Sequence, residues 1–177
     1  METRIIPYSK TFENDCFDLI KRIVTDGFVE EGIDIRKEKK HLDEELRIQF
    51  ERIREHSHHY LLAQKGKAVI GMIAHLQPCG AVRLAMKNLD MGSPSIREIV
   101  AVYVHPDYQR RGIGSRLFSE MLDVLRHDKV EYFSVSTGYK KGRAFWTKKL
   151  GRVSELLPAY YNGHPCSVWI RKVSDIM

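Results

Sequence analysis

A turn rich in proline, arginine and glycine is the part of the sequence best suited to chemistry. It reads His105-Pro106-Asp107-Tyr108-Gln109-Arg110-Arg111-Gly112-Ile113-Gly114-Ser115. Pro106 has no backbone N–H to donate to a strand, and the glycines let the chain turn tightly without Cβ atoms in the way. Where a helix begins, the first N–H groups lack partners within the helix and the dipole is positive, so such a turn can hold an anion. Because Arg110 and Arg111 add full positive charges, the pattern predicts a phosphate-binding turn.

Two common phosphate loops do not fit this spacing. The sequence contains no Gly-x-x-x-x-Gly-Lys-Ser/Thr, and the dinucleotide-binding pattern would need a third Gly or Ala where Leu117 stands. Neither a P-loop nucleotide-binding protein nor a Rossmann dinucleotide-binding protein is therefore indicated.

The turn lies between an apolar strand and an amphipathic helix. Residues 98–105 are apolar at nearly every central position, as expected of a strand covered on both faces. After the turn, apolar residues recur at steps of four, which predicts a helix to about His127: Ile113, Leu117, Met121 and Leu125. The chemistry is therefore expected at the end of a central strand.

The remaining segments complete an alternation of strands and helices. Their periodicity predicts strands over residues 3–9, 60–63, 68–76, 130–137 and 166–173, and helices over residues 12–28, 35–56 and 141–150. Residues 78–95 contain Gly80, Gly92 and Pro94 and show no clean period, so we predict a loop there. This order indicates an α/β (α+β) fold with hairpins toward its ends.

Length and composition restrict the class of protein. A chain of 177 residues with 43% hydrophobic and 29% charged residues fits a single globular domain over residues 1–177. No apolar run approaches the roughly 20 residues that cross a bilayer, and the first residues do not resemble a signal peptide. The three scattered cysteines, Cys16, Cys79 and Cys166, form neither an even disulfide set nor a metal-binding pair. We therefore expect a soluble protein in a reducing, cytoplasmic setting.

The net charge of +6 is unevenly distributed along the chain. Residues 1–60 carry 11 basic against 14 acidic residues, or −3, whereas residues 61–177 carry 18 against 9, or +9. The basic residues are dispersed, so the surplus fits a small polyanionic ligand as well as a nucleic acid.

The turn also has the pattern Gln/Arg-x-x-Gly-x-Gly/Ala, with an apolar strand before it and an amphipathic helix after it. In this context it resembles the acetyl-CoA pyrophosphate loop of the GNAT superfamily of N-acetyltransferases, which often has glycine where Gly71 stands. The resemblance covers about residues 3–173. It implies a mixed, mostly antiparallel central sheet of about 6–7 strands flanked by about four helices.

The resemblance also implies roles for particular residues. The backbone groups of Val102, Tyr103 and Val104 would pair with the pantetheine arm, and the Val104 amide would support the thioester carbonyl. Glu98 lies in a segment that looks like the histone-acetylating branch of the superfamily, where a glutamate is the general base. Backbone amides would hold the pyrophosphate of acetyl-CoA: those of Gln109, Arg110, Arg111, Gly112, Ile113, Gly114 and Ser115.

Acyl transfer to an amine needs a neutral nitrogen. For an amine of pKa about 10.4, losing the proton at pH 7 costs roughly 4.6 kcal/mol. A carboxylate such as Glu98 can take that proton directly or through water. The family often has a tyrosine in its last helix that protonates the leaving thiolate, but Trp146-Thr147 stand at that place. Tyr160 and Tyr161, in the loop before the last strand, are the expected substitutes.

We therefore expect an acetyl-CoA-dependent N-acetyltransferase that acts by direct attack of the amine. The acidic first third favours a cationic small-molecule amine, and a protein lysine or N-terminal amine is the alternative within the class. Outside the class of N-acetyltransferases, Thr147 at the place of the usual tyrosine leaves open a non-catalytic sensor that binds acyl-CoA. A nucleic-acid binder ranks below the enzyme and the sensor. No metal, membrane or nucleic-acid partner is expected, and a homodimer is left open.

The run His56-Ser57-His58-His59 brings only two imidazoles together, so it is interpreted as a helix-to-strand boundary.

Overall fold

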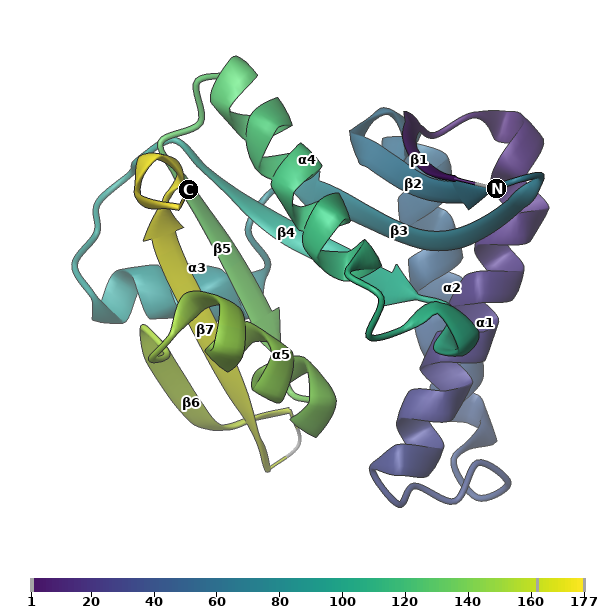
Figure 1. Cartoon of the computed structure of the whole chain (residues 1–177). Helices are drawn as coiled ribbons and strands as arrows, with labels where there is room; N and C mark the ends of the chain where they lie inside the picture. The colour runs from purple at the N-terminus through teal and green to yellow at the C-terminus, as the bar shows by residue number, and fades with distance from the viewer. Residues whose placement is uncertain (1, 162, 177) are drawn as a thin grey trace. The chain divides into compact units, whose positions relative to one another are not determined.

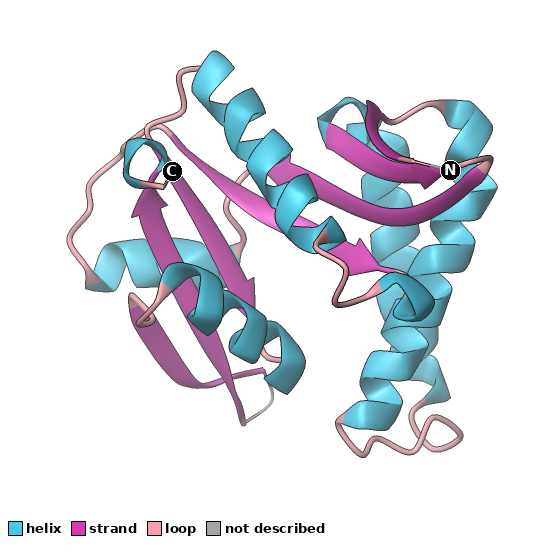
Figure 2. Cartoon of the chain, viewed as in Figure 1, coloured by secondary structure: helices cyan, strands magenta, loops and turns pink. Residues whose placement is uncertain are grey.

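The computed structural model describes residues 2–161 and 163–176, without the side chain of Tyr161. Figures 1 and 2 show the strands and helices of this part of the chain. The strands are β1 (Thr3–Pro7), β2 (Tyr60–Lys65), β3 (Ala68–Leu76), β4 (Ile96–Val104), β5 (Tyr132–Thr137), β6 (Glu155–Tyr161) and β7 (His164–Lys172). The helices are α1 (Glu13–Glu30), α2 (Lys39–His56), α3 (Gly80–Asn88), α4 (Ile113–His127) and α5 (Lys140–Leu150), and the short 3-10 turn η3 (Pro106–Tyr108) precedes α4.

The strands form one sheet in the order β1-β2-β3-β4-β5-β7-β6. The pairs β1–β2, β2–β3, β5–β7 and β6–β7 are antiparallel, whereas β4 and β5 run parallel. The predicted mixed and mostly antiparallel sheet is therefore confirmed. The described residues form seven strands and five α-helices, one helix more than the expected number.

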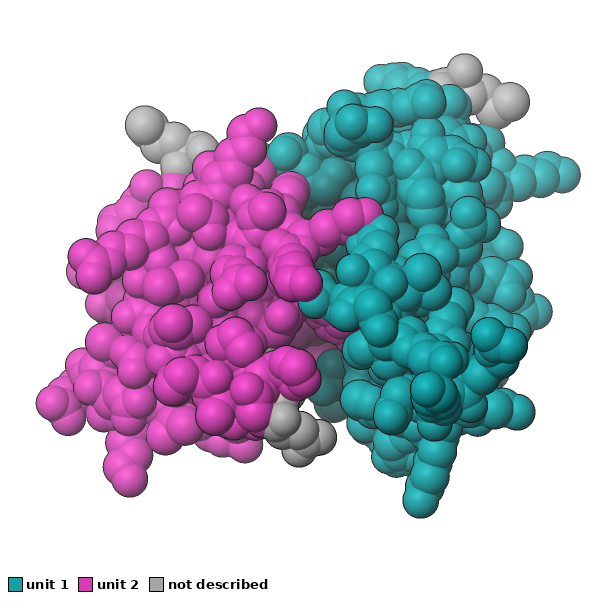
Figure 3. All heavy atoms as spheres, turned by 90° about the horizontal axis from the view of Figure 1, so that it is seen from below, with its two compact units in different colours: residues 1–74, 101–121 teal, residues 75–100, 122–177 magenta. Residues whose placement is uncertain are grey.

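The chain divides into two compact units, which Figure 3 colours separately. Unit 1 comprises residues 1–74 and 101–121, and unit 2 comprises residues 75–100 and 122–177. The chain passes from one unit to the other within β3, β4 and α4. The single domain expected from the length of the chain stays a prediction.

Unit 1 contains the β2–β3 hairpin and the helices α1 and α2. The rings of Phe17 and Phe50 stack at 4.3 Å between centroids and join the two helices. A Cβ atom on Gly71 of β3 would lie 3.0 Å from Tyr103 O and 3.1 Å from Leu117 Cδ1. Glycine at this position therefore lets β4 and the first half of α4 pack closely against β3.

Helix α3 corrects the sequence prediction for residues 78–95, where the pattern indicates a loop. Ala81, Val82 and Ala85 are fully buried on one face of this helix. They pack into an apolar cluster with residues of β4, β6 and β7: Ile96, Leu157, Cys166, Val168 and Ile170. The helix has only nine residues, too few for a repeating period, and tertiary packing stabilises it more than its own propensity does.

Strand β6 corrects a second expectation, because Tyr160 and Tyr161 belong to a strand and not to a loop. The strand pairs with β7 from Glu155 opposite Val168, and its register shifts between Leu157 and Tyr161. As an edge strand with an irregular register, it lacks the clean alternation that marks a strand in the sequence. The other predicted elements are present with ends displaced by a few residues; helix α2, for example, begins at Lys39 and not at residue 35.

Hydrogen bonds from Arg171 of β7 connect the end of α5 with the loop that follows it. Its guanidinium donates to Leu150 O at 2.8 Å and to Ser154 Oγ at 2.7 Å, and it also donates to Arg152 O and Ile170 O. Hydrogen bonds from a charged donor contribute about 1.5–3 kcal/mol each, and a lysine ammonium cannot reproduce this fork. We expect Arg171→Lys to lower the free energy of unfolding, measured in urea, by about 2–3 kcal/mol.

The matched control is Arg36→Lys, since the side chain of Arg36 is 97% exposed. This change is expected to stay within about 0.5 kcal/mol of the unchanged protein. Equal effects of the two substitutions would contradict the structural role assigned to Arg171.

Candidate active site

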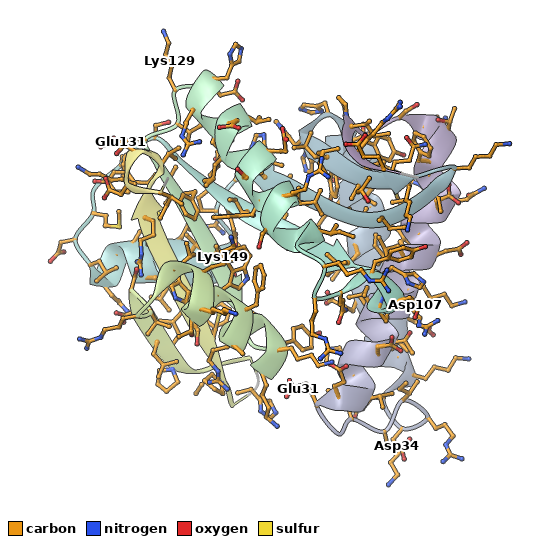
Figure 4. All side chains as sticks on the ribbon, in the orientation of Figure 1. Glu31, Asp34, Asp107, Lys129, Glu131 and Lys149 are labelled. Atoms are coloured by element: carbon orange, nitrogen blue, oxygen red, sulfur yellow. The ribbon has the colours of Figure 1, made fainter. Side chains whose placement is uncertain are left out.

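The predicted phosphate-binding turn begins where β4 ends. The His105 amide donates to Ile70 O of β3 at 2.9 Å, and His105 Nδ1 accepts a hydrogen bond from the Asp107 amide at 3.3 Å. Gln109 Nε2 reaches back to Val104 O at 3.0 Å. These bonds fix η3 at the strand end, and the exposed Asp107 side chain projects from it (Figure 4).

Two residues of the turn have a left-handed backbone. The φ angle is 59° at Arg110 and 79° at Gly112. Turns that include such residues can direct successive amides to one concave side, which suits an anion. The first hydrogen bond of α4 runs from the Arg116 amide to Gly112 O at 2.9 Å, so the amides of residues 113–115 are the first-turn donors of the helix.

Positive side chains gather around the aromatic ring of this turn. Lys65 Nζ lies 5.1 Å from the centroid of the Tyr108 ring, and the guanidinium carbon of Arg111 lies 5.6 Å from it. Both distances suit a cation–π contact. The turn therefore combines backbone donors with nearby positive charge, which is the chemistry that a diphosphate requires.

Strand β4 changes its backbone conformation at Ala101, just before residues 102–104. The φ angle of Ala101 is 53°, which is uncommon for a residue other than glycine. Glu98 and Ile99 are both buried although they are adjacent, so the usual alternation of the strand is also broken. The regular backbone geometry of the central strand is thus broken at Ala101, next to the residues expected to face the pantetheine arm.

Glu98 is a buried carboxylate at the start of helix α3. Only 3% of its surface is exposed. Its Oε2 accepts a hydrogen bond from the Cys79 amide at 2.7 Å, and its Oε1 accepts one from Ser136 Oγ at 2.6 Å. Cys79 is the N-cap residue of α3, so Glu98 joins β4 to the first turn of this helix and to β5. A carboxylate near a helix N-terminus is also favoured by the helix dipole.

The thiol of Cys79 completes the surroundings of this carboxylate. Its Sγ lies 3.5 Å from Glu98 Oε1 and 3.7 Å from Ser136 Oγ. Burial raises the pKa of the Cys79 thiol, and the Glu98 carboxylate raises it further. The thiol is therefore a poor nucleophile at neutral pH and acts here as a hydrogen-bond donor.

Tyr160 reaches the same end of α3 from strand β6. A Cβ atom on Gly80 would lie 2.5 Å from the Tyr160 hydroxyl oxygen, so only glycine leaves room for the hydroxyl in this position. Tyr160 is 37% exposed. Burial, followed by the Cys79 thiol, raises the pKa of Tyr160, so the phenol carries its proton at neutral pH.

Unit 2 thus brings two of the three predicted catalytic side chains, Glu98 and Tyr160, to one helix end. The third, Tyr161, has its backbone opposite His164, while its side chain lies outside the described residues. On α5, Trp146 is buried and Thr147 is exposed. The sequence analysis did not identify the contacts of Gly80 with Tyr160 or of Ser136 with Glu98. Only Gly80 could have been noticed in the sequence, as a glycine in a segment without a clear period.

The histidine run shows close ring contacts at the start of β2. The His58 and His59 rings lie 3.8 Å apart, and the His56 and His59 rings 6.5 Å apart. Within residues 2–161 and 163–176, no group of three or more His, Cys, Asp or Glu side chains is placed to hold a metal ion. In the same part of the chain, no helix combines the length and apolar character needed to cross a membrane.

Comparison with known proteins assigns the family. The model of the acetyltransferase (GNAT) family matches residues 22–151. Ard1 from Thermoplasma volcanium has a similar fold, with a TM-score of 0.67 and 16% identity over 100% of this chain and 99% of that one. No curated protein matches the sequence.

Two further similar structures were solved with a ligand. The PaiA N-acetyltransferase from Thermoplasma acidophilum, in complex with coenzyme A, gives a TM-score of 0.60 at 15% identity over 96% of this chain and 99% of that one. YncA from Salmonella typhimurium, with its cofactor acetyl-CoA, gives 0.64 at 15% identity over 98% and 95%. The chain belongs to the acetyltransferase (GNAT) family, as the turn and its surroundings predict.

Proposed function

We propose that the protein is an acetyl-CoA-dependent N-acetyltransferase in which the amine attacks the thioester directly. The observation that carries this proposal is the turn after β4, where left-handed residues lead into the first-turn amides of α4 and cations lie nearby. These groups fit the diphosphate of acetyl-CoA. The ligands of the PaiA and YncA structures support the same assignment, as does the family itself.

The proposed mechanism uses groups on or near β4. Glu98 takes the proton of the amine, whose removal at pH 7 costs roughly 4.6 kcal/mol for an amine of pKa about 10.4. The Val104 amide, beyond the interruption at Ala101, supports the developing oxyanion. Tyr160 returns a proton to the leaving thiolate, and Tyr161 is the second candidate for this role.

For the acceptor we propose a cationic small-molecule amine. Residues 1–60 carry a net charge of −3. Within unit 1, three aspartates of α1 line an open groove of about 510 Å³ that also contains Lys21, Arg22 and His105: Asp15, Asp18 and Asp26. Negative charge in this first third of the chain favours a positively charged guest over an acidic one. A protein lysine or an N-terminal amine is the second candidate.

A non-catalytic acyl-CoA sensor is the candidate from another class. It is favoured by the exposed Thr147 on α5. This residue stands where the family often has the tyrosine that protonates the leaving thiolate. Tyr160 argues for catalysis, since its protonated hydroxyl lies at the same helix end as Glu98. The cytoplasmic location and the homodimer stay predictions.

The test combines calorimetry with a thiol-release assay. We expect coenzyme A to bind, and acetyl-CoA to release free thiol when a suitable amine is added from a panel of 1,4-diaminobutane, spermidine, a lysine peptide and a peptide with a free N-terminus. Binding without amine-dependent thiol release would favour the sensor. Absence of any coenzyme A binding would refute both candidates.

The role of Tyr160 can be tested without removing it. Gly80→Ala adds one methyl group that would meet the Tyr160 hydroxyl, and the partly exposed ring can swing away. Because alanine suits a helix better than glycine, we expect the free energy of unfolding to stay equal or rise by up to about 1 kcal/mol. Displacement of the hydroxyl is expected to lower kcat by about 10- to 100-fold.

Tyr160→Phe is the matched comparison, because it removes the same hydroxyl and leaves Gly80 unchanged. If Gly80→Ala retains full kcat and a crystal structure shows a displaced Tyr160, this tyrosine is not the acid.

A further inference from the structure

The carboxylate of Glu98 is enclosed, which raises the question of how a proton reaches it. With 3% of its surface exposed, the side chain offers an incoming amine almost no direct access. Both of its oxygens already accept hydrogen bonds, one from the Cys79 amide and one from Ser136 Oγ. A proton from outside must therefore pass through a group that already contacts the carboxylate.

Ser136 is the contact with the right chemistry to pass a proton. A backbone amide such as that of Cys79 only donates, and the Cys79 thiol, which donates to Glu98 Oε1 at 3.5 Å, is only a weak acceptor for an incoming proton. A serine hydroxyl donates one proton and also has lone pairs that can accept another. The Ser136 hydroxyl is bound to Glu98 Oε1 at 2.6 Å, a short bond of the kind formed with a charged acceptor.

The position of Ser136 on β5 also suits this task. The parallel pairing of β4 with β5 joins Glu98 to Ser134, and Ser136 is the next residue on the same face of β5. Ser134 is fully buried, whereas Ser136 is half-buried. Ser136 is therefore more exposed than the carboxylate that it contacts.

We propose that Ser136 is a proton-relay residue between the attacking amine and Glu98, an inference that rests on the proposed acetyltransferase function. One N–H proton of the cationic amine passes to Ser136 Oγ while the Ser136 hydroxyl proton passes to Glu98 Oε1, and the neutral nitrogen then bonds to the thioester carbon. As the C–S bond breaks, the electron pair leaves with sulfur and the thiolate takes the hydroxyl proton of Tyr160, while the surplus proton of the acetylated nitrogen restores that hydroxyl.

The test compares two substitutions of equal shape, Ser136→Thr and Ser136→Val, using the amine of the panel that is acetylated fastest. Thr keeps a hydroxyl and Val replaces it with a methyl group, and both suit a strand. We expect Ser136→Thr to retain kcat within a few-fold, and Ser136→Val to lose about 10- to 100-fold, as for loss of a proton-transfer group. The KM for acetyl-CoA should be unchanged in both.

A double variant shows whether Ser136 acts through Glu98. If the two residues form one path, Ser136→Val combined with Glu98→Gln should lose no more kcat than Glu98→Gln alone. The control is Ser134→Ala on the same face of β5, which is expected to retain kcat. Equal kcat for the Thr and Val variants, or losses that multiply in the double variant, would overturn the relay. A wild-type protein that releases no thiol with any amine would refute the proposed function itself, and the relay with it.

Discussion

Glu98→Gln is expected to lower kcat for amine acetylation by about 10²- to 10⁴-fold, the usual contribution of a positioned base. Glutamine has the same shape, and its amide oxygen can still accept the hydrogen bond that Glu98 receives from the Cys79 amide. The variant should therefore fold, which thermal unfolding would verify. Binding of coenzyme A should be unchanged, because the pyrophosphate turn lies elsewhere on the chain.

The pH dependence separates a lost base from a general loss of activity. Without a base, the reaction depends on amine that is already neutral, and this fraction rises about tenfold per pH unit below the pKa of the amine. The rate of Glu98→Gln should therefore recover steeply between about pH 7 and pH 10, more steeply than that of the wild type. Glu120→Gln, an exposed change on α4, is the control. If Glu98→Gln had the same kcat as this control at pH 7, the assignment of Glu98 as the base would be wrong.

The second large effect is expected for Gly112→Val in the turn proposed to bind the pyrophosphate. The φ angle of Gly112 is 79°, a conformation that a β-branched residue adopts only under strain of about 1–2 kcal/mol. Relief of this strain would redirect the amides at the start of α4. We expect the affinity for coenzyme A, measured by calorimetry, to fall at least about tenfold, since losing one hydrogen bond to a charged group already costs about 1.5–3 kcal/mol.

Gly92→Val is a matched control, because Gly92 has a similar φ of 68°. A Cβ atom added at either glycine would meet no described atom within 4 Å apart from those of its chain neighbours. The control should therefore impose a similar backbone strain and leave coenzyme A binding intact. Unchanged affinity in Gly112→Val, or an equal loss in Gly92→Val, would show that the turn after β4 does not hold the diphosphate.

The turn after β4 could be predicted from the sequence because its determinants are local. Proline, two glycines and two arginines within a few residues of an apolar strand are visible without knowledge of the fold. Glu98 could be singled out because its segment resembles that of the histone-acetylating branch of the superfamily. What the sequence could not show is its surroundings, since Cys79 and Ser136 lie 19 and 38 residues away along the chain.

Helix α3 and strand β6 could not be predicted from the sequence for a related reason. The helix is short, and its buried alanines and valine differ little from those of an apolar loop until β4, β6 and β7 pack against them. The strand has an irregular register at the edge of the sheet, so its residues do not alternate clearly. Tyr160 could therefore be named as a candidate acid, but its fit against Gly80 depends on both elements.

The bond from the Cys79 amide to Glu98 makes the anchoring of α3 independent of the side chain at position 79. Every amino acid except proline supplies this N–H. Residue 79 could thus diversify over evolutionary time, reshaping the neighbourhood of the carboxylate, while the carboxylate itself keeps its orientation. Proline at this position would remove the bond.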